Sequence, residues 1–181
     1  MRKFALVFSL AAMFVATAFA QTSDRGRGTG DLYVGYAHLS GDVGKNGWNA
    51  TGTYNFSRYL GLEGDIGGYY GSTSLLTINA KNHEYSFMAG PKVRFETQNP
   101  KFIPWGHFLL GVGHSSLNTN VAVNSSDTAF TWILGGGADY VFRPQWAGRA
   151  KFDLYHDDYF STGETHARLG FGIVYRWGGT Q

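Results

Sequence analysis

The chain has 181 residues and a formal net charge of +2, with 15% charged residues, 17% aromatic residues, 26 glycines and no cysteine. Soluble domains average about 25% charged residues and about 7% glycine, so this composition differs from theirs in both respects. The lack of cysteine excludes a lipid-anchored lipoprotein and a disulfide scaffold.

The first twenty residues have the pattern of an export signal. Arg2 and Lys3 precede an apolar run over 4–16, and an Ala-Phe-Ala triplet follows as a cleavage site. The apolar run is shorter than the about 20 residues that a membrane anchor needs. We therefore expect a signal peptide over 1–20 and a flexible lead-in over 21–30. Because Arg2 and Lys3 account for the excess charge, the mature chain is formally neutral and predicts no nucleic-acid partner.

From Asp31 onward, apolar and polar residues alternate with a period of two, and no helical stripe is present. Such alternation predicts β-strands. Eight strands are expected, over residues 31–38, 48–56, 60–71, 83–95, 103–115, 128–142, 146–155 and 166–177. Several of these reach the about 9 to 11 residues that a tilted strand needs to cross a bilayer.

The expected connections alternate in length. Brief turns follow the second, fourth and sixth strands, at residues 57–59, 96–102 and 143–145. Longer segments rich in Gly, Asn, Ser and Asp follow the other strands, at residues 39–47, 72–82, 116–127 and 156–165. This layout is typical of outer-membrane barrels. The sequence therefore predicts an all-β fold, an eight-stranded antiparallel up-and-down transmembrane β-barrel over 31–177. A short tail over 178–181 would follow, and both termini would lie in the periplasm.

The two faces of the expected strands differ in side-chain size and charge. One face is bulky and apolar, and an eight-stranded barrel is only just wide enough inside for side chains to fill it, so this face should meet lipid. The other face is small or polar and mixes acids with bases, and each Lys or Arg turned toward the bilayer midplane would cost about 2 to 4 kcal/mol. We therefore expect a polar interior closed by an ion-pair network, or at most a narrow pore. The expected network comprises Glu63, Asp65, Glu84, Lys92, Arg94, Asp139, Arg149, Lys151, Asp153, Arg168 and Arg176.

Aromatic residues gather near both expected membrane boundaries, where amphipathic rings prefer to lie. The expected girdle has one band at the short-turn end, comprising Phe56, Phe95, Trp105, Tyr140, Trp146, Tyr175 and Trp177. A second band at the long-loop end includes Trp48, Tyr70 and Tyr155.

The chain resembles the small OmpA/OmpX-type outer-membrane barrel domains. The resemblance rests on the segments 31–36, 88–95, 135–140 and 171–177, and it covers nearly the whole mature chain. It implies a barrel in the cell outer membrane, in contact with outer-membrane lipid and lipopolysaccharide. In the family, a terminal aromatic residue, matched here by Trp177, is recognised by the outer-membrane assembly machinery. The resemblance further implies a non-enzymatic role, either structural in the envelope or in surface interaction with an unknown ligand through the loops.

Two other function classes remain open. The pair His114 and Ser116 resembles that of outer-membrane lipid A deacylases, in which a nearby acid orients the histidine as general base, and Asp127 is the candidate acid. A histidine and serines at the end of a strand, next to a polar loop, are more often plain rim residues, so we expect no enzyme. An exported soluble lipocalin-like binding barrel, with the apolar face inside, is the second alternative.

No cofactor is expected. The segment around the last long loop contains His156, Asp157, Asp158, Glu164 and His166, whose oxygens and nitrogens could bind a cation. Their spacing matches no defined site, so the sequence predicts no metal site and a solvated acidic loop instead.

Overall fold

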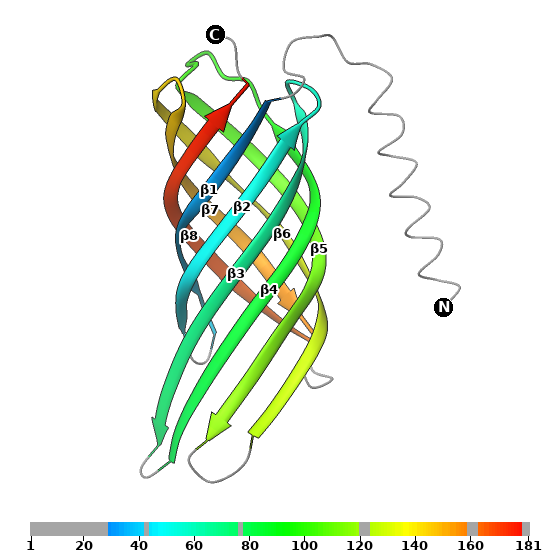
Figure 1. Ribbon diagram of the computed structural model, residues 1–181, viewed down its shortest axis with the longest axis vertical. Helices are drawn as coiled ribbons and strands as arrows, with labels where there is room; N and C mark the ends of the chain where they lie inside the picture. Colours follow the sequence, from blue (N-terminus) through cyan, green and yellow to red (C-terminus); the bar gives the residue numbers. More distant parts are fainter. Residues whose placement is uncertain (1–28, 42–43, 76–77, 120–123, 159–162, 179–181) are drawn as a thin grey trace, which may run out of the picture.

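Eight antiparallel strands form a closed barrel, in which each strand pairs with its neighbours in sequence and β1 pairs with β8 (Figure 1). The computed structural model describes residues 29–41, 44–75, 78–119, 124–158 and 163–178. The strands are β1 (Thr29–Leu39), β2 (Lys45–Asn55), β3 (Leu60–Leu75), β4 (Ile78–Arg94), β5 (Phe102–Thr119), β6 (Asn124–Arg143), β7 (Trp146–Asp157) and β8 (Glu164–Trp177). The expected fold class is confirmed. Among the described residues there is no helix with the length and hydropathy needed to span a bilayer.

The expected strand limits agree with the structure to within two residues at the short-turn end and differ by up to five residues at the loop end. The signal peptide lies outside the described residues, and so does most of the lead-in, but Thr29 and Gly30 already belong to β1 and pair with Asn55 and Tyr54. The lead-in is therefore shorter than expected. The first residues of β1 are of types common in turns, so the sequence did not show that the strand begins there. Their backbone groups are satisfied by pairing with β2.

Four strands continue well beyond the others at the loop end, where the long connections were expected (Figure 1). The strands β3 to β6 have 16 to 20 residues, whereas β1, β2, β7 and β8 have 11 to 14. Most of the expected loops 72–82 and 116–127 are therefore strand, with pairing as far as Leu75↔Ile78 and Asn118↔Asn124. Ser, Thr and Asn are typical of loops, but a paired neighbour satisfies their backbone groups equally well.

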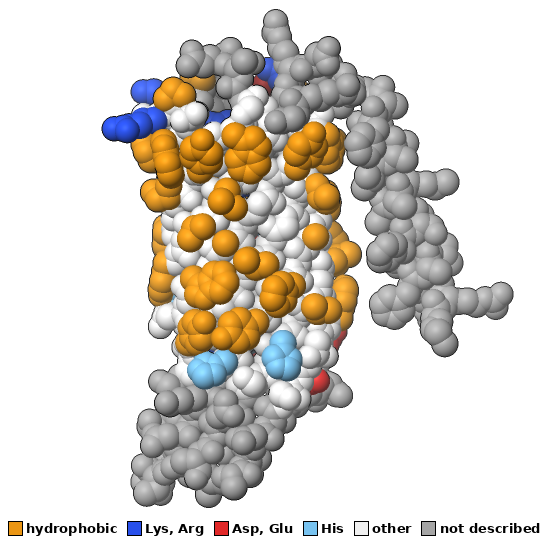
Figure 2. All heavy atoms as spheres, viewed as in Figure 1, with side chains coloured by type: hydrophobic (Ala, Val, Ile, Leu, Met, Phe, Trp, Pro, Cys, Tyr) orange, Lys and Arg blue, Asp and Glu red, His pale blue; other side chains and the backbone are white. Residues whose placement is uncertain are grey.

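The outer wall of the barrel is covered by exposed hydrophobic side chains (Figure 2). Phe171 is 57% exposed and Ile173 48%, whereas Arg168, Gly170 and Val174 at the alternate positions of β8 are buried. The expected girdle residues Trp48, Tyr70, Phe95, Tyr140, Trp146, Tyr175 and Trp177 are all exposed on this wall, and Phe56 is half-buried.

Two residues expected in the girdle lie inside the barrel instead. Trp105 is 3% exposed and Tyr155 is fully buried. Both lie on the inward-pointing positions of their strands, since Phe108 on β5 and Leu154 on β7 are exposed at the alternate positions. The girdle assignment was wrong for these two rings because residue type was weighed above their place in the period-two pattern.

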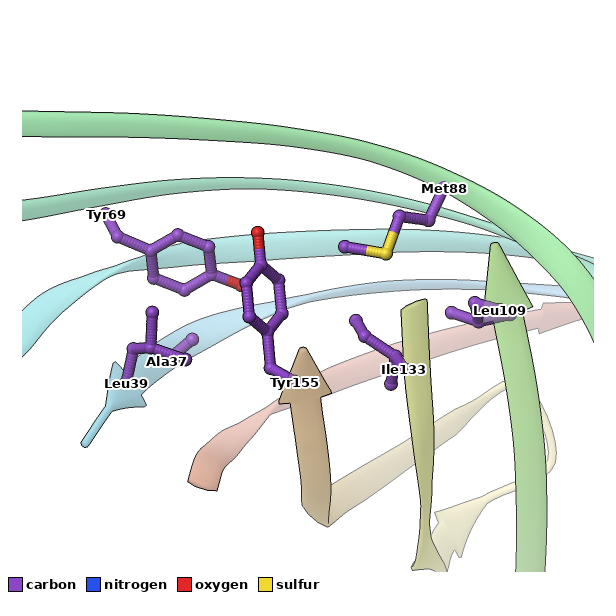
Figure 3. Packing of buried hydrophobic residues seen from close by; sticks show 7 residues of the cluster. All are labelled: Ala37, Leu39, Tyr69, Met88, Leu109, Ile133 and Tyr155. Carbon is purple, nitrogen blue, oxygen red and sulfur yellow. The ribbon is translucent and has the colours of Figure 1, made fainter. Parts of the chain in front are cut away.

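The loop-side half of the lumen contains an apolar cluster that the sequence reasoning did not anticipate. In Figure 3 the side chains of the cluster point toward one another from several strands, and the rings of Tyr69 and Tyr155 meet edge to face with centroids 6.2 Å apart. Seven buried residues form it: Ala37, Leu39, Tyr69, Met88, Leu109, Ile133 and Tyr155. The inward face is therefore small and polar only in part. The cluster lies on the loop side of the charged layer described next.

Candidate functional site

A layer of buried charges fills the lumen between the apolar cluster and the short-turn end. Strand alternation brings it about, because inward positions on seven of the eight strands meet around one axis. We call it the lumen network; its members are Asp31, Glu63, Asp65, Lys92, Arg94, His107, Asp139, Arg149, Lys151, Asp153 and Arg168. It contains five carboxylates, five lysines or arginines, and one histidine, so its charges nearly cancel.

Asp31 joins strands that are far apart in the sequence at the turn side of the lumen network. Its Oδ2 atom accepts a hydrogen bond from Arg94 Nη2 at 2.6 Å, and its Oδ1 atom accepts one from Arg149 Nη2 at 2.9 Å. Arg149 also binds Asp139 through two donors, Nε at 2.7 Å and Nη2 at 2.9 Å. Such forked, charge-assisted contacts are the strong kind of hydrogen bond.

Glu63 and His107 lie at the centre of the network. Lys92 Nζ donates to Glu63 Oε2 at 2.5 Å, and both side chains are almost entirely buried. The two ring nitrogens of His107 each face a carboxylate, Glu63 Oε1 at 2.6 Å and Asp153 Oδ1 at 3.0 Å. An ionised carboxylate only accepts hydrogen bonds, so a His107 ring with an N–H on both nitrogens would donate to Glu63 and Asp153 at once.

Arg168 connects β3, β7 and β8 on the side nearest the apolar cluster. Its guanidinium donates to Asp153 through Nε at 2.8 Å and to Asp65 through Nη1 at 3.2 Å and Nη2 at 3.1 Å. A further donation, from Nη1 to the Tyr69 hydroxyl at 2.9 Å, links the network to the apolar cluster. Arg168 is fully buried. Lys151 completes this side through Asn49 and through Asp65, which lies 3.4 Å from Nζ.

Trp105 takes part in the network rather than in the girdle. Its indole Nε1 donates to Asp139 Oδ1 at 3.0 Å. Lys92 Nζ lies 4.5 Å from its ring centroid, and the Arg149 guanidinium carbon lies 4.9 Å from it. The ring therefore stabilises two buried cations through its π face as well as one carboxylate through its N–H.

The structure unites most but not all of the side chains expected in the network. Glu84 lies apart, beyond the apolar cluster, where it pairs with Lys45 at 2.6 Å and accepts from Tyr155 at 2.8 Å. Arg176 is half-buried at the turn end and forms no ion pair with a described residue. Both were grouped with the rest because a shared face does not reveal the height along the barrel axis.

Sequence reasoning missed Asp31 and His107, although the pattern contained the signal. Asp31 precedes the outward-facing Leu32, and His107 precedes the outward-facing Phe108. The alternation alone therefore places both side chains inside.

The candidate catalytic residues do not converge. His114 is exposed on the outer wall, where its Nδ1 atom lies 2.8 Å from Thr128 Oγ1, and Ser116 donates to the His83 carbonyl at 3.5 Å. Asp127 stands opposite the buried, inward-facing Ser115 in the register of β5 and β6. Its carboxylate accepts a hydrogen bond from the Thr128 amide at 2.8 Å. The acid therefore lies on the opposite face of the sheet from the His-Ser pair, so no triad is assembled.

The residues considered for cation binding form two separate sets of contacts, one around His166 and one around His156. His166 Nε2 lies 3.6 Å from Asp157 and 3.4 Å from Glu164, and His156 Nε2 lies 3.5 Å from Asp158. Within the described part of the chain, no group of three or more such side chains could hold a metal ion.

Several solved structures have a similar fold. Ail, the attachment invasion locus protein of Yersinia pestis, is 21% identical with a TM-score of 0.61, over 83% of this chain and 99% of that one. Neisserial surface protein A is 16% identical with a TM-score of 0.66, over 82% and 96%. The outer membrane protein OprG of Pseudomonas aeruginosa is 13% identical with a TM-score of 0.54, over 87% and 99%. Identities at this level show the fold alone.

A search of the curated proteins finds no significant match. The family model described as the outer membrane protein beta-barrel domain matches residues 6–176, which is nearly the entire chain. The closed eight-stranded barrel, its apolar wall and its charged lumen agree with this assignment. The chain is therefore an integral outer-membrane β-barrel and belongs to the outer membrane protein β-barrel domain family.

Proposed function

We propose that this protein is a non-enzymatic barrel with a closed lumen, which acts in the outer membrane as a structural or surface-interaction protein. The observation that supports closure is the burial of charged side chains across the lumen. A continuous aqueous pore would expose the side chains lining it, yet Glu63, Lys92 and Arg168 are 0% exposed. The buried apolar cluster lies on the loop side of these charged residues, inside the same lumen.

In planar bilayers, the purified protein is expected to give no large stable current. A double variant, E63A/K92A, removes a matched acid and base from the centre of the network and keeps the net charge unchanged. We expect it to conduct more often than the native protein, because it loses two space-filling side chains on the axis. Large stable currents from the native protein would show that the lumen is open.

The non-enzymatic part of the proposal is supported by the separation of Asp127 from His114 and Ser116 across the sheet. Purified protein incubated with lipid A is expected to release no more fatty acid than the variant H114A does. Release by the native protein that is lost in H114A would make the protein a lipid A hydrolase, because only a catalytic role of His114 produces that difference.

The surface-interaction role is supported by the strands β3 to β6, which continue beyond the other strands at the loop end. There, β3 continues from Gly71 to Leu75 beyond its last pair with the described part of β2, Asn46↔Tyr70. Unpaired strand edges are able to accept an added strand from a partner. Among proteins of this fold, Ail has been solved with the heparin analogue sucrose octasulfate. Our proposal places this end outside the cell and both chain termini in the periplasm.

A further inference from the structure

Four histidines lie on the outer wall of the barrel at its loop end. His38 on β1, His83 on β4, His114 on β5 and His156 on β7 share this position, and we call them the histidine belt. In Figure 2, histidine side chains follow directly after the last row of hydrophobic side chains at this end.

Each residue of the belt stands two positions beyond the last bulky apolar residue on the outward face of its strand. These last apolar residues are, in the same order, Tyr36, Tyr85, Val112 and Leu154, and all four are exposed. Aromatic and apolar side chains end where the acyl chains of a bilayer end, at the level of the headgroups. The belt therefore lies at the headgroup level of the leaflet nearest the loop end.

The histidine rings are held in place by contacts with residues on the neighbouring strands. Nδ1 lies 2.8 Å from Asn46 Oδ1 in His38, from Thr128 Oγ1 in His114 and from Thr165 Oγ1 in His156. Ring contacts add support, since His156 stacks on Trp132 with centroids 5.0 Å apart and His83 packs against Tyr70 at 5.5 Å. With Nδ1 engaged in three of the rings, the Nε2 edge is the one that can meet a ligand.

Among the side chains that the structure describes, almost no fixed charge faces the belt. The residues directly opposite on the neighbouring strands are all uncharged: Asn46, Leu169, Tyr70, Ser116, Tyr85, Thr128, Trp132 and Thr165. Among the described residues, one carboxylate lies near a belt ring: that of the exposed Asp158, 3.5 Å from His156 Nε2. At the other end of the barrel the exposed cations are permanent ones, namely Arg58, Lys101 and Arg143.

We propose that the histidine belt binds the phosphate groups of lipids in the loop-end leaflet, and that it does so on mild acidification. Imidazole is the side chain that gains its charge between about pH 8 and pH 5. An imidazolium at headgroup level attracts lipid phosphate and can donate a charge-assisted hydrogen bond to it. The diagonal neighbours His83 and His114 on adjacent strands are close enough to bind one phosphate together.

The proposal is tested by measuring how the reconstituted protein selects lipids as the pH changes. The protein is placed in phosphatidylcholine vesicles containing spin-labelled phosphatidylglycerol or spin-labelled phosphatidylcholine, and the motionally restricted fraction of each is compared by electron paramagnetic resonance. Phosphatidylglycerol keeps one negative charge throughout, so only the protein titrates. We expect its relative association constant to rise about twofold between about pH 7.5 and pH 5.5, since one charge near such a surface changes binding about fivefold and the belt meets one leaflet only.

Variants show whether the histidine belt causes the rise in phosphatidylglycerol association on acidification. In H38Q/H83Q/H114Q/H156Q the rise with acidification is expected to disappear. In H166Q it should persist, because His166 lies at the same end but contacts Asp157 and Glu164. Should the glutamine variant fail to insert, H38R/H83R/H114R/H156R decides, since fixed cations should give the high preference at both pH values.

Three results would overturn the proposal. These are an unchanged lipid preference in the native protein, a rise that persists in the glutamine variant, and an arginine variant without raised preference at neutral pH. Loss of the lipid preference when inorganic phosphate replaces chloride at equal ionic strength would also overturn it, by showing a site for soluble anions instead of lipid.

Discussion

Replacing Arg168 by methionine is expected to lower the free energy of unfolding by about 3 to 5 kcal/mol. The methionine fills similar space but removes the guanidinium group, which donates to both Asp65 and Asp153. Both carboxylates stay buried. Removing one partner of a buried ion pair is costly because the remaining charge cannot be solvated. Urea titration of the protein folded in phospholipid vesicles, followed by tryptophan fluorescence, measures the loss.

The matched control for this prediction is R58M. Arg58 also forms an ion pair, with Glu96 at 2.5 Å, but its side chain is 46% exposed and that of Glu96 is 52% exposed. An exposed pair of this kind contributes about 0 to 1 kcal/mol. Equal losses in R168M and R58M would mean that the lumen network does not hold its charges as the contacts indicate.

Replacing Phe171 by arginine is expected to lower the free energy of unfolding in a bilayer by about 2 to 4 kcal/mol. Phe171 is 57% exposed near the middle of β8, so an arginine there would face acyl chains. The same urea titration in vesicles measures the change, because the cost arises only where lipid surrounds the barrel.

A second arginine substitution, Y175R, is the control. Tyr175 lies on the same outward face of β8 as Phe171 but close to its turn-end limit, where an arginine costs about 0 to 1 kcal/mol. If F171R were harmless and Y175R costly, the apolar wall would not be the lipid-facing surface.

The fold was predictable from the sequence because its information is local. Period-two alternation identifies each strand, and the alternation of short and long connections gives the up-and-down order. In a barrel of this kind each strand pairs with its neighbours in sequence, so no long-range choice remains except closure between β1 and β8.

The interior was predictable only in part, because alternation gives the face of a residue and not its height or its partners. Glu63 and Glu84 share the inward face, yet the apolar cluster separates them in the structure. The cluster itself was missed because the inward face was expected to be small or polar, and inward apolar residues such as Leu109 and Ile133 were not assigned to either face. Their inward position follows from exposed Phe108 and Leu134 at the alternate positions, so strict use of the pattern would have found it.

The way in which Asp31 is bound has a consequence for how the barrel assembles. Its partners Arg94 and Arg149 come from β4 and β7, which are far from β1 in the sequence. A partly inserted sheet would therefore contain carboxylates and guanidinium groups whose counterions have not yet arrived, in surroundings that cannot solvate them. Intermediates of this kind are high in free energy, so insertion and closure should proceed as one cooperative event of high contact order.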